Sequence, residues 1–563
     1  MVDVTEETRS CVGVVLGTKD ATPLEFWVGV AEGHQVELDD VVRVDSHTTD
    51  GEVLSFYGTV DEVRKRYEGA TFDTDAFRHA AGQLPTEISY AAHVQVTRIE
   101  PEFFVPPTPG EPVILVRGQD YQQALFFDQM ESKLPIGLTR NQEPVYANLE
   151  FVDGTRGAHA SISGVSGVAT KTSFATFLLY SLFHSNILGT RAVNSKAIIF
   201  NVKGEDLLWL DKANNRLSEK SRQQYALLGL PVGPFSSVKI VAPPRTAETL
   251  VPSSSRLEGV DAFCWTLRDF ARDGLLKFCF TQEDERAQLS FVVQIVERYL
   301  VECAKEGDKN LPYIYVENRQ IRTFEELVDE LEANIDGILA KRGGRIASGT
   351  VDAFLRRLRA AGARMGQLVR GDDAAKGRSV DTGHAQVTVV DIHGLHATAQ
   401  MFVVGVVLKR IMEAKERAGS QNLVFVVLDE LNKYAPRSGS SPISETILDI
   451  AERGRSLGVS LLGAQQTASE VERRVVANAA LRVVGRLDPA ESGRQEYGFL
   501  KGAARIRSTM IRPGTMIVSQ PEIPTPLLVQ FPFPSWATRQ SEVVDTPFDP
   551  SDDGIGTFGR PQG

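Results

Sequence analysis

Two patterns of apolar positions divide the chain. From about residue 11 to residue 99, short apolar and polar alternations are separated by turn sequences such as TKDATP and TTDGE. Side chains of a strand point alternately to its two faces, so runs such as EFWVGV and HVQVTRIE predict half-buried strands. Their spacing predicts a small N-terminal β-barrel, which we place at residues 1–105, and the proline-rich EPEFFVPPTPGEP predicts a linker after it.

Beyond about residue 111 the pattern changes to apolar strands followed by helices. The strands are the apolar parts of HASISGVSG, KAIIFNVKG, QVTVVDIHG, NLVFVVLDE and VSLLGAQQT. Strands flanked by helices predict a parallel α/β sheet, which we place at residues 106–242 and 381–535. Helical periodicity in FEELVDELEANIDGILAK and VDAFLRRLRAAGARMGQLV predicts a helical insertion at 243–380. The Pro-, Gly- and Asp-rich residues 536–563 predict a flexible tail.

Composition excludes several classes of protein. Of 563 residues, 42% are hydrophobic and 24% charged, which is the balance of a globular protein rather than a disordered one. The longest clean apolar stretch, Met401–Leu408, is too short to span a membrane. The acidic MVDVTEETRS start does not resemble a secretory signal, so we expect a cytoplasmic protein without a membrane partner. The four cysteines show no C-x-x-C spacing, which indicates reduced structural thiols.

A glycine- and serine-rich turn between an apolar strand and an apolar helix predicts a phosphate-binding loop. Its candidate nucleotide-binding residues are Gly164, Ser166, Gly167, Val168, Ala169, Thr170, Lys171, Thr172 and Ser173. Lys171 would neutralise phosphate oxygens, and the Thr172 hydroxyl would bind Mg²⁺. Val165 and Thr170 occupy the two glycine positions of the strict G-x-x-x-x-G-K-[ST] pattern, so the loop departs from it. The alternative is an ordinary strand-to-helix turn with a surface lysine.

The run NLVFVVLDELNKYAP ends an apolar strand in Asp429 and Glu430. In nucleotide hydrolases such an aspartate organises Mg²⁺, and such a glutamate polarises the attacking water. An Asp-Glu pair at a strand end is also a common start of a helix, which is the alternative interpretation. Because this motif follows the glycine-rich loop in one predicted sheet, the two together favour a nucleotide-binding site with Mg²⁺.

Four further residues are candidates for catalysis. Gln465 ends the next strand, where an amide could sense the γ-phosphate or position water. Arg453 and Arg455 precede that strand and Arg482 follows it, and a guanidinium from one subunit of a ring could complete the site of its neighbour. The alternatives are a polar strand end and surface or ion-paired arginines. In FNVKGEDL, Asn201, Lys203, Gly204 and Glu205 end another strand, where Glu205 could order water or metal or act as a cap.

Charge is distributed unevenly along the chain. The formal net charge of −12 argues against indiscriminate coating of nucleic acid. Residues 341–378 nevertheless contain ten Lys or Arg and three Asp or Glu. Their arginines predict either a surface that follows DNA phosphates or a solvated helix face; they include Arg356, Arg357, Arg359, Arg364 and Arg370. His384, His393 and His396 match no metal-ligand spacing, so no metal site is expected there.

These motifs resemble the HerA branch of the HerA/FtsK superfamily of P-loop ATPases. The resemblance rests on GVSGVATKTS, FNVKGED, VVDIHGL, VFVVLDELNKYAP, ERGRSLGVSLLGAQQTASE with ANAALRVVGRL, and PGTMIVSQPEIPTPLLVQF. It implies an α/β, RecA-like P-loop ATPase core with a small N-terminal β-barrel and a helical insertion subdomain. It also implies a homo-hexameric ring that hydrolyses ATP to translocate double-stranded DNA. Lys171 and Thr172 would serve the phosphate loop, Asp429 and Glu430 would be the Mg²⁺ and catalytic pair, and Gln465 would be the sensor.

Such motors usually work with a nuclease in DNA-end processing or anti-phage defence, so a nuclease or other effector is an expected partner. Two other functions compete with translocation. A nucleotide-binding ring scaffold for an effector, with little turnover, is favoured by the departure in the phosphate loop and opposed by the retained Glu430. A membrane-anchored DNA pump is disfavoured because no apolar stretch is long enough to span a membrane.

Overall fold

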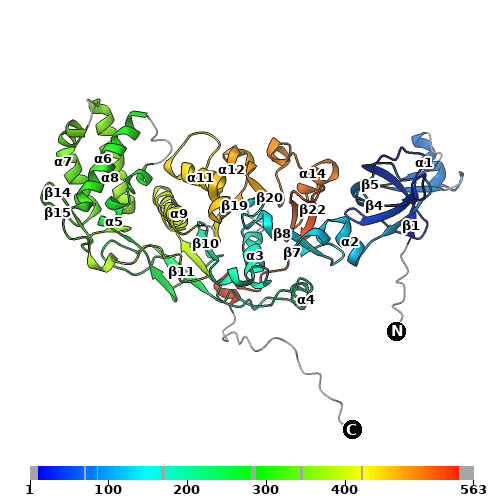
Figure 1. Ribbon diagram of the computed structural model, residues 1–563, viewed down its shortest axis with the longest axis horizontal. Coiled ribbons are helices and arrows are strands. Elements are labelled where there is room, and N and C mark those ends of the chain that lie inside the picture. The colour runs from blue at the N-terminus through cyan, green and yellow to red at the C-terminus, as the bar shows by residue number, and fades with distance from the viewer. Residues whose placement is uncertain are drawn as a thin grey trace, which may run out of the picture. The chain divides into compact units, whose positions relative to one another are not determined.

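The computed structural model describes residues 11–68, 72–84, 87–165, 171–280, 287–342, 346–419 and 422–543 (Figure 1). The chain divides into two compact units. Unit 1 comprises Met1–Val152, Ser161–Lys171 and Ala480–Phe531. Unit 2 comprises Asp153–Ala160, Thr172–Ala479 and Pro532–Gly563.

Unit 1 begins with a closed six-stranded barrel in the order β1-β2-β5-β4-β3-β6. The strands are β1 (Cys11–Val15), β2 (Glu25–Val30), β3 (Val41–His47), β4 (Val53–Tyr67), β5 (Ile88–Glu100) and β6 (Pro112–Leu115). All neighbours are antiparallel, and β6 closes the barrel by pairing with both β1 and β3. The long β4 and β5 continue as a two-stranded ribbon beside the short helix α1 (Asp73–Ala80).

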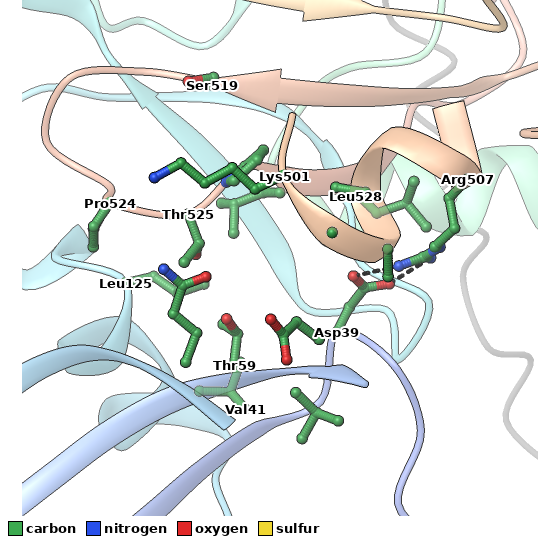
Figure 2. A pocket seen from close by; sticks show the side chains of 18 of the residues that line it. Asp39, Val41, Thr59, Leu125, Lys501, Arg507, Ser519, Pro524, Thr525 and Leu528 are labelled. Atoms are coloured by element: carbon green, nitrogen blue, oxygen red, sulfur yellow. Dashed lines mark hydrogen bonds and ion pairs between the residues drawn. The ribbon is translucent and has the colours of Figure 1, made fainter. Parts of the chain in front are cut away.

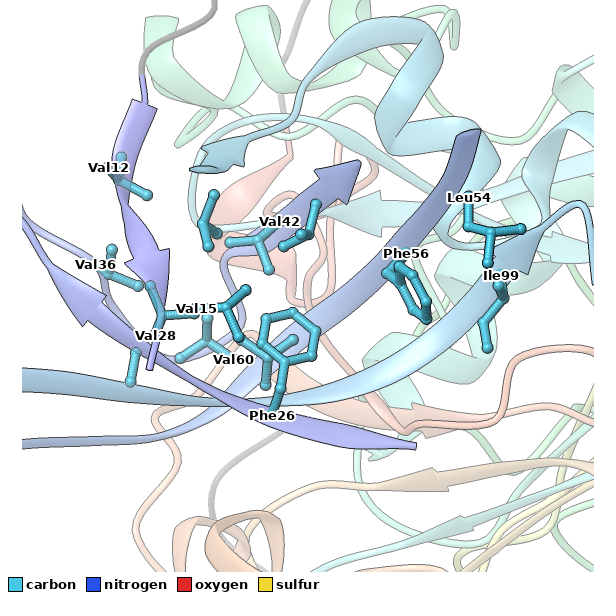
Figure 3. Close-up of a cluster of buried hydrophobic side chains, with 14 residues drawn as sticks. Val12, Val15, Phe26, Val28, Val36, Val42, Leu54, Phe56, Val60 and Ile99 are labelled. Atoms are coloured by element: carbon cyan, nitrogen blue, oxygen red, sulfur yellow. The ribbon is translucent and has the colours of Figure 1, made fainter. Parts of the chain in front are cut away.

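The alternating apolar side chains of these strands meet inside the barrel (Figure 3). Phe26, Val44, Phe56 and Val94 are completely buried there. Burial of each large apolar side chain stabilises the fold by about 1.5–3 kcal/mol. The interior is therefore a packed core rather than a channel.

Phe56→Ala is expected to lower the free energy of unfolding by about 3–5 kcal/mol, because it removes a ring and leaves a cavity. Phe77→Ala is the matched control, since Phe77 of α1 is 77% exposed. Urea unfolding of the two variants measures the difference. Equal midpoints for Phe56→Ala and wild type would contradict this account of the barrel core.

The barrel extends beyond the boundary at residue 105 that the sequence predicted. Its closing strand β6 follows the proline-rich segment that we interpreted as a linker. Pro112 occupies the first position of β6, where a residue without a backbone N–H is tolerated. The strand is only four residues long, so it carries too little periodicity to be seen in the sequence.

The remaining strands of unit 1 follow the order β9-β20-β21-β22-β7-β8. They are β20 (Ala479–Val484), β21 (Thr515–Ser519), β22 (Leu527–Gln530), β7 (Lys133–Leu138) and β8 (Pro144–Asn148). From β20 to β8 the neighbours are antiparallel. The wholly parallel sheet predicted from the sequence is therefore wrong for this part of the chain. Short connections such as that between β7 and β8 allow antiparallel pairing, whereas parallel pairing needs a longer crossover.

Three helices accompany these strands: α2 (Gly118–Ala124), α13 (Pro489–Ser492) and α14 (Gly502–Ser508). A cavity of about 260 Å³ lies within unit 1, between barrel residues such as Val41 and residues near α14 such as Lys501 (Figure 2). Beside it, Arg507 donates two hydrogen bonds to the carboxylate of Asp39, at 2.8 and 2.7 Å. This two-pronged pair joins α14 to the barrel.

Unit 2 contains a parallel sheet in the order β12-β11-β17-β10-β18-β19-β9. Its strands are β12 (Val260–Ala262), β11 (Val238–Ala242), β17 (Val387–Asp391), β10 (Lys196–Asn201), β18 (Val424–Leu428), β19 (Val459–Gln465) and β9 (Ala158–Ser163), whose last three residues belong to unit 1. The central strands are almost wholly buried, as expected for a sheet covered on both faces. Its helices include α3 (Lys171–His184), α4 (Glu219–Leu227), α9 (Ala397–Ala418), α10 (Leu431–Tyr434), α11 (Pro442–Leu457) and α12 (Arg473–Ala477). Among the described residues, no helix has the length and apolarity needed to cross a membrane.

The stretch between β12 and β17 is mainly helical. It contains α5 (Leu267–Arg272), α6 (Ala287–Lys305), α7 (Phe324–Arg342) and α8 (Ser348–Met365), with the short strands β13 (Trp265–Thr266), β14 (Ile314–Val316), β15 (Arg319–Ile321) and β16 (Val369–Arg370). Figure 1 shows α6, α7 and α8 grouped together, and they pack on one another. The apolar side of α8 repeats every three or four residues and is buried. The sequence did not predict β11 and β12, and β12 lies inside the range expected for the insertion.

The tail predicted to be flexible from residue 536 is held in place at its start. Trp536 is completely buried and lies against the rings of Tyr180 and Phe235, with ring centroids 4.9 and 5.1 Å apart. The side-chain amide of Asn214 donates to the backbone oxygen of Trp536 at 3.1 Å. The prediction is therefore wrong for 536–543, because a single aromatic anchor outweighs the polar composition around it; residues 544–563 lie outside the described part of the chain.

Candidate functional site

The glycine-rich loop follows β9, whose six residues are all buried. Gly164 and Lys171 stand at its two ends, and Lys171 is the first residue of α3. The Lys171 ammonium, which is 5% exposed, donates to the backbone oxygen of Gly164 at 2.5 Å. The other loop candidates Ser166, Gly167, Val168, Ala169 and Thr170 lie outside the described residues. The Lys171 side chain thus turns back toward the end of β9.

The first turn of α3 contacts the end of β18. The hydroxyl of Thr172 donates to Asp429 Oδ2 at 3.3 Å, although the two residues are 257 positions apart in the chain. Asp429 is buried directly after β18. Ser173 follows Thr172 in the same half-buried turn. A hydroxyl and a carboxylate oxygen are hard ligands of the kind that Mg²⁺ prefers, so this pair fits the predicted metal-binding role.

Glu430 has an uncommon backbone conformation. Its φ of 58° and ψ of 44° lie in the left-handed region, which costs a residue with a side chain about 1–2 kcal/mol. Its backbone N–H donates to Asp429 Oδ1 at 2.8 Å, which helps to fix this turn. Such strain concentrates where a side chain must be directed to a function.

Two neighbouring strand ends contact the Glu430 carboxylate. The Lys203 ammonium forms an ion pair with Glu430 Oε1 and lies 3.7 Å from Asp429 Oδ2. The side-chain amide of Gln466 donates to the same Oε1 at 3.1 Å. Lys203 follows β10 and Gln466 follows β19, which are the two neighbours of β18.

Gln465 is the last residue of β19 and is completely buried. In the strand order, β19 lies between β18, which leads to Asp429 and Glu430, and β9, which leads to the loop. Parallel pairing of β18 with β19 brings their carboxyl ends to the same edge. Gln465 therefore stands at the edge where Asp429 and Glu430 emerge.

Sequence reasoning missed three residues of this region. Lys203 stands in FNVKGED and Gln466 beside Gln465, and neither position indicates a role from the sequence alone. Tyr434, in α10, is completely buried, and its pKa is raised above the ordinary value by burial and by the nearby carboxylates of Asp429 and Glu430. No local pattern marks these residues, since each contact joins different strands or a strand and a helix.

The candidate arginines contact other groups. Arg453 forms ion pairs with Glu416 at 2.7 Å and with Asp449 at 3.1 Å. Arg455 donates to the backbone oxygens of Gly154 and Thr155. Arg482 lies in β20 opposite Ser519. A role for any of them in a neighbouring subunit's site stays a prediction.

Several arginines of the basic segment contact local groups, and a role for this segment in following DNA phosphates stays a prediction. Arg370 is buried and ion-paired with Asp372 at 2.5 Å. Arg359 pairs with Asp329 and Glu332 of α7. Arg364 donates to the hydroxyl of Thr398 at 3.2 Å. Local carboxylates thus offset part of the positive charge counted from the sequence, while Arg356 is exposed and Arg357 half-buried on α8.

The three histidines considered as metal ligands each contact a group close by in the sequence. His393 Nδ1 lies 2.7 Å from Asp391, whose carboxylate also accepts from Asn201 and Ser254. His384 pairs with Asp381, and His396 caps α9. Within the described ranges, no three His, Cys, Asp or Glu side chains are grouped to hold a metal ion.

A buried histidine joins the loop strand to β19. His159 of β9 accepts from the backbone N–H of Leu461 at 2.9 Å through Nδ1, and its backbone N–H donates to the hydroxyl oxygen of Ser460 at 3.2 Å. Burial lowers the pKa of His159 to about 4 from an ordinary value of 6.5. The ring is therefore neutral in the folded chain, as its acceptor role requires.

Acidification from pH 7.5 to 5.5 is expected to lower the free energy of unfolding through His159 by about 1 kcal/mol. The sign follows because below about pH 6.5 the unfolded chain binds a proton that the folded chain does not. His159→Asn, whose amide oxygen can still accept from Leu461, should remove this dependence, whereas His47→Asn at an exposed position should keep it. Urea unfolding at both pH values measures it, and an unchanged pH dependence in His159→Asn would contradict the assignment.

No family model matches the sequence, and no curated protein matches it. Among solved structures, the chain is similar to VirB4 of Thermoanaerobacter pseudethanolicus, with 14% identity and a TM-score of 0.44 over 71% of this chain and 96% of that one. It is also similar to the bacterial conjugative coupling protein TrwB, with 13% identity and a TM-score of 0.47 over 75% of this chain and 94% of that one. TrwB in complex with the non-hydrolysable ATP analogue ADPNP matches at 14% identity and a TM-score of 0.44, over 69% and 88%.

Proposed function

We propose that the chain binds ATP with Mg²⁺ at the carboxyl edge of its parallel strands and hydrolyses it. The observation that carries this proposal is the hydrogen bond between Thr172 and Asp429. It brings the helix that follows the glycine-rich loop to the acidic strand end, as a site for nucleotide phosphates requires.

Each residue has a distinct task in this proposal. Lys171 neutralises phosphate oxygens, Glu430 accepts a proton from the attacking water, and Gln465 orients that water or senses the γ-phosphate. Thr172 and Asp429 would hold Mg²⁺, which when bound would offset the charge of the β- and γ-phosphates. Lys203 supplies a further positive charge beside both carboxylates.

We further propose that this core is RecA-like, with residues 243–380 as its helical insertion, and that it assembles into a hexameric ring that translocates double-stranded DNA. The order of the motifs and their resemblance to the HerA branch support this part. A ring also gives Arg453, Arg455 and Arg482 a possible use in completing a neighbour's site. The nuclease or effector partner stays a prediction from the resemblance.

Glu430→Gln is expected to retain ATP binding and to lower turnover about 10²- to 10⁴-fold, because an amide cannot take the proton from water. Lys171→Ala should weaken binding itself. The measurement is steady-state ATP hydrolysis with and without linear double-stranded DNA, with oligomer mass recorded on the same samples. DNA-stimulated turnover by a large ring supports a motor.

Glu413→Gln is the matched control, because Glu413 is paired with Lys409 on α9 and has no part in the proposed reaction. It should turn over ATP like wild type. Equal turnover in Glu430→Gln and wild type would show that Glu430 is not the base.

A nucleotide-binding ring scaffold with little turnover is the second candidate. Two observations favour it: Val165 and Thr170 replace glycines of the strict phosphate-loop pattern, and Glu430 Oε1 is already engaged by Lys203 and Gln466. Nucleotide binding by a large assembly, with negligible hydrolysis with or without DNA, would identify it.

A further inference from the structure

The Glu430 carboxylate is engaged from both sides by side chains that hydrolysis itself does not require. Lys203 pairs with Oε1 from the end of β10, and Gln466 donates to the same oxygen from the end of β19. An oxygen that already accepts from an ammonium and an amide is poorly placed to accept a proton from water. We call Lys203 and Gln466 together the clasp.

The position of Lys203 is set by the strand before it. β10 and β18 are parallel with Phe200 opposite Leu428, so the chain leaves both strands at the same level. The Asn201 side chain donates to the backbone oxygen of Gly204 and to Asp391, both at 2.9 Å, and so closes the turn that carries Lys203. The Lys203 side chain thereby reaches Glu430, which follows the neighbouring strand β18.

The ion pair between Lys203 and Glu430 is of a kind that breaks at little cost. The Lys203 side chain is 47% exposed, and ion pairs between exposed groups contribute little to stability. Gly204, with a φ of 54°, has no atom within 4 Å of the place where a Cβ would lie. The backbone at Gly204 therefore faces open space, while Asn201 holds the base of the turn.

We propose that Lys203 and Gln466 restrain Glu430 in the resting protein, and that release of Lys203 is the step that raises ATP turnover. This inference rests on the proposed ATPase function, whose base is Glu430. Lys203 is a positioning residue in this scheme: it contacts the base rather than the substrate.

The test is Lys203→Met, which keeps most of the side-chain length and removes the charge. Basal ATP turnover without DNA should rise about fivefold, which corresponds to about 1 kcal/mol, the upper range for an exposed ion pair. The ratio of turnover with DNA to turnover without DNA should fall by the same factor, and ATP binding should be retained. Gln466→Leu should act in the same direction.

Two controls separate the clasp from a structural effect. Lys203→Arg keeps the charge and should behave like wild type. Lys212→Met removes a lysine of similar exposure, paired with Asp211, and should leave basal turnover unchanged. A variant that merely loosened the fold would lower turnover, whereas release of the clasp raises it.

The outcomes also distinguish the clasp from the function on which it rests. Lower or equal turnover in Lys203→Met, with ATP binding retained and wild type active, would overturn the clasp and leave the ATPase intact. Turnover in Lys203→Met but not in wild type would support the clasp strongly. Absence of ATP binding in both would overturn the proposed function, and the clasp with it.

Discussion

The parallel register of β10, β18 and β19 is the constraint on which the candidate site depends. Phe200 stands opposite Leu428, and Leu428 opposite Gly463, so the three strands end together. In parallel sheets, ligands bind at the carboxyl ends of the strands, because every strand is followed there by a loop on the same edge. Residues separated by more than two hundred positions, such as Thr172 and Asp429, meet there without any local signal between them.

Opposite charges lie in contact at this edge of the sheet. Asp429 and Glu430 are adjacent carboxylates, and Lys203 reaches both. The acidic pair thus has a cationic partner within the chain, the Lys203 ammonium. Phosphates and Mg²⁺ would compete with these internal contacts. In such an ATPase, turnover would be controlled by which group contacts Asp429 and Glu430: the Lys203 ammonium, or the bound phosphates and Mg²⁺.

Many strands of the two units could be predicted from the sequence. The apolar runs predicted β9, β10, β17, β18 and β19, and EFWVGV and HVQVTRIE predicted the barrel strands β2 and β5, because long or regularly alternating apolar runs indicate buried strand faces. Short strands were missed: β6 begins with a proline, and β11 and β12 lie among polar turns. The antiparallel strands of unit 1 and the burial of Trp536 depend on tertiary pairing. Lys203 and Gln466 could be noticed as polar strand ends, but only the register shows that both reach Glu430.

Equilibrium titration with a fluorescent ATP analogue, with and without Mg²⁺, tests most directly whether this edge is a nucleotide-phosphate site. The account predicts saturable binding that Mg²⁺ strengthens in wild type, and loss of the Mg²⁺ effect in Thr172→Ala with the fold intact. Ser181→Ala, a buried serine of α3 further along the helix, is expected to bind like wild type. Binding that is absent, or that responds to Mg²⁺ equally in wild type and Thr172→Ala, would contradict it.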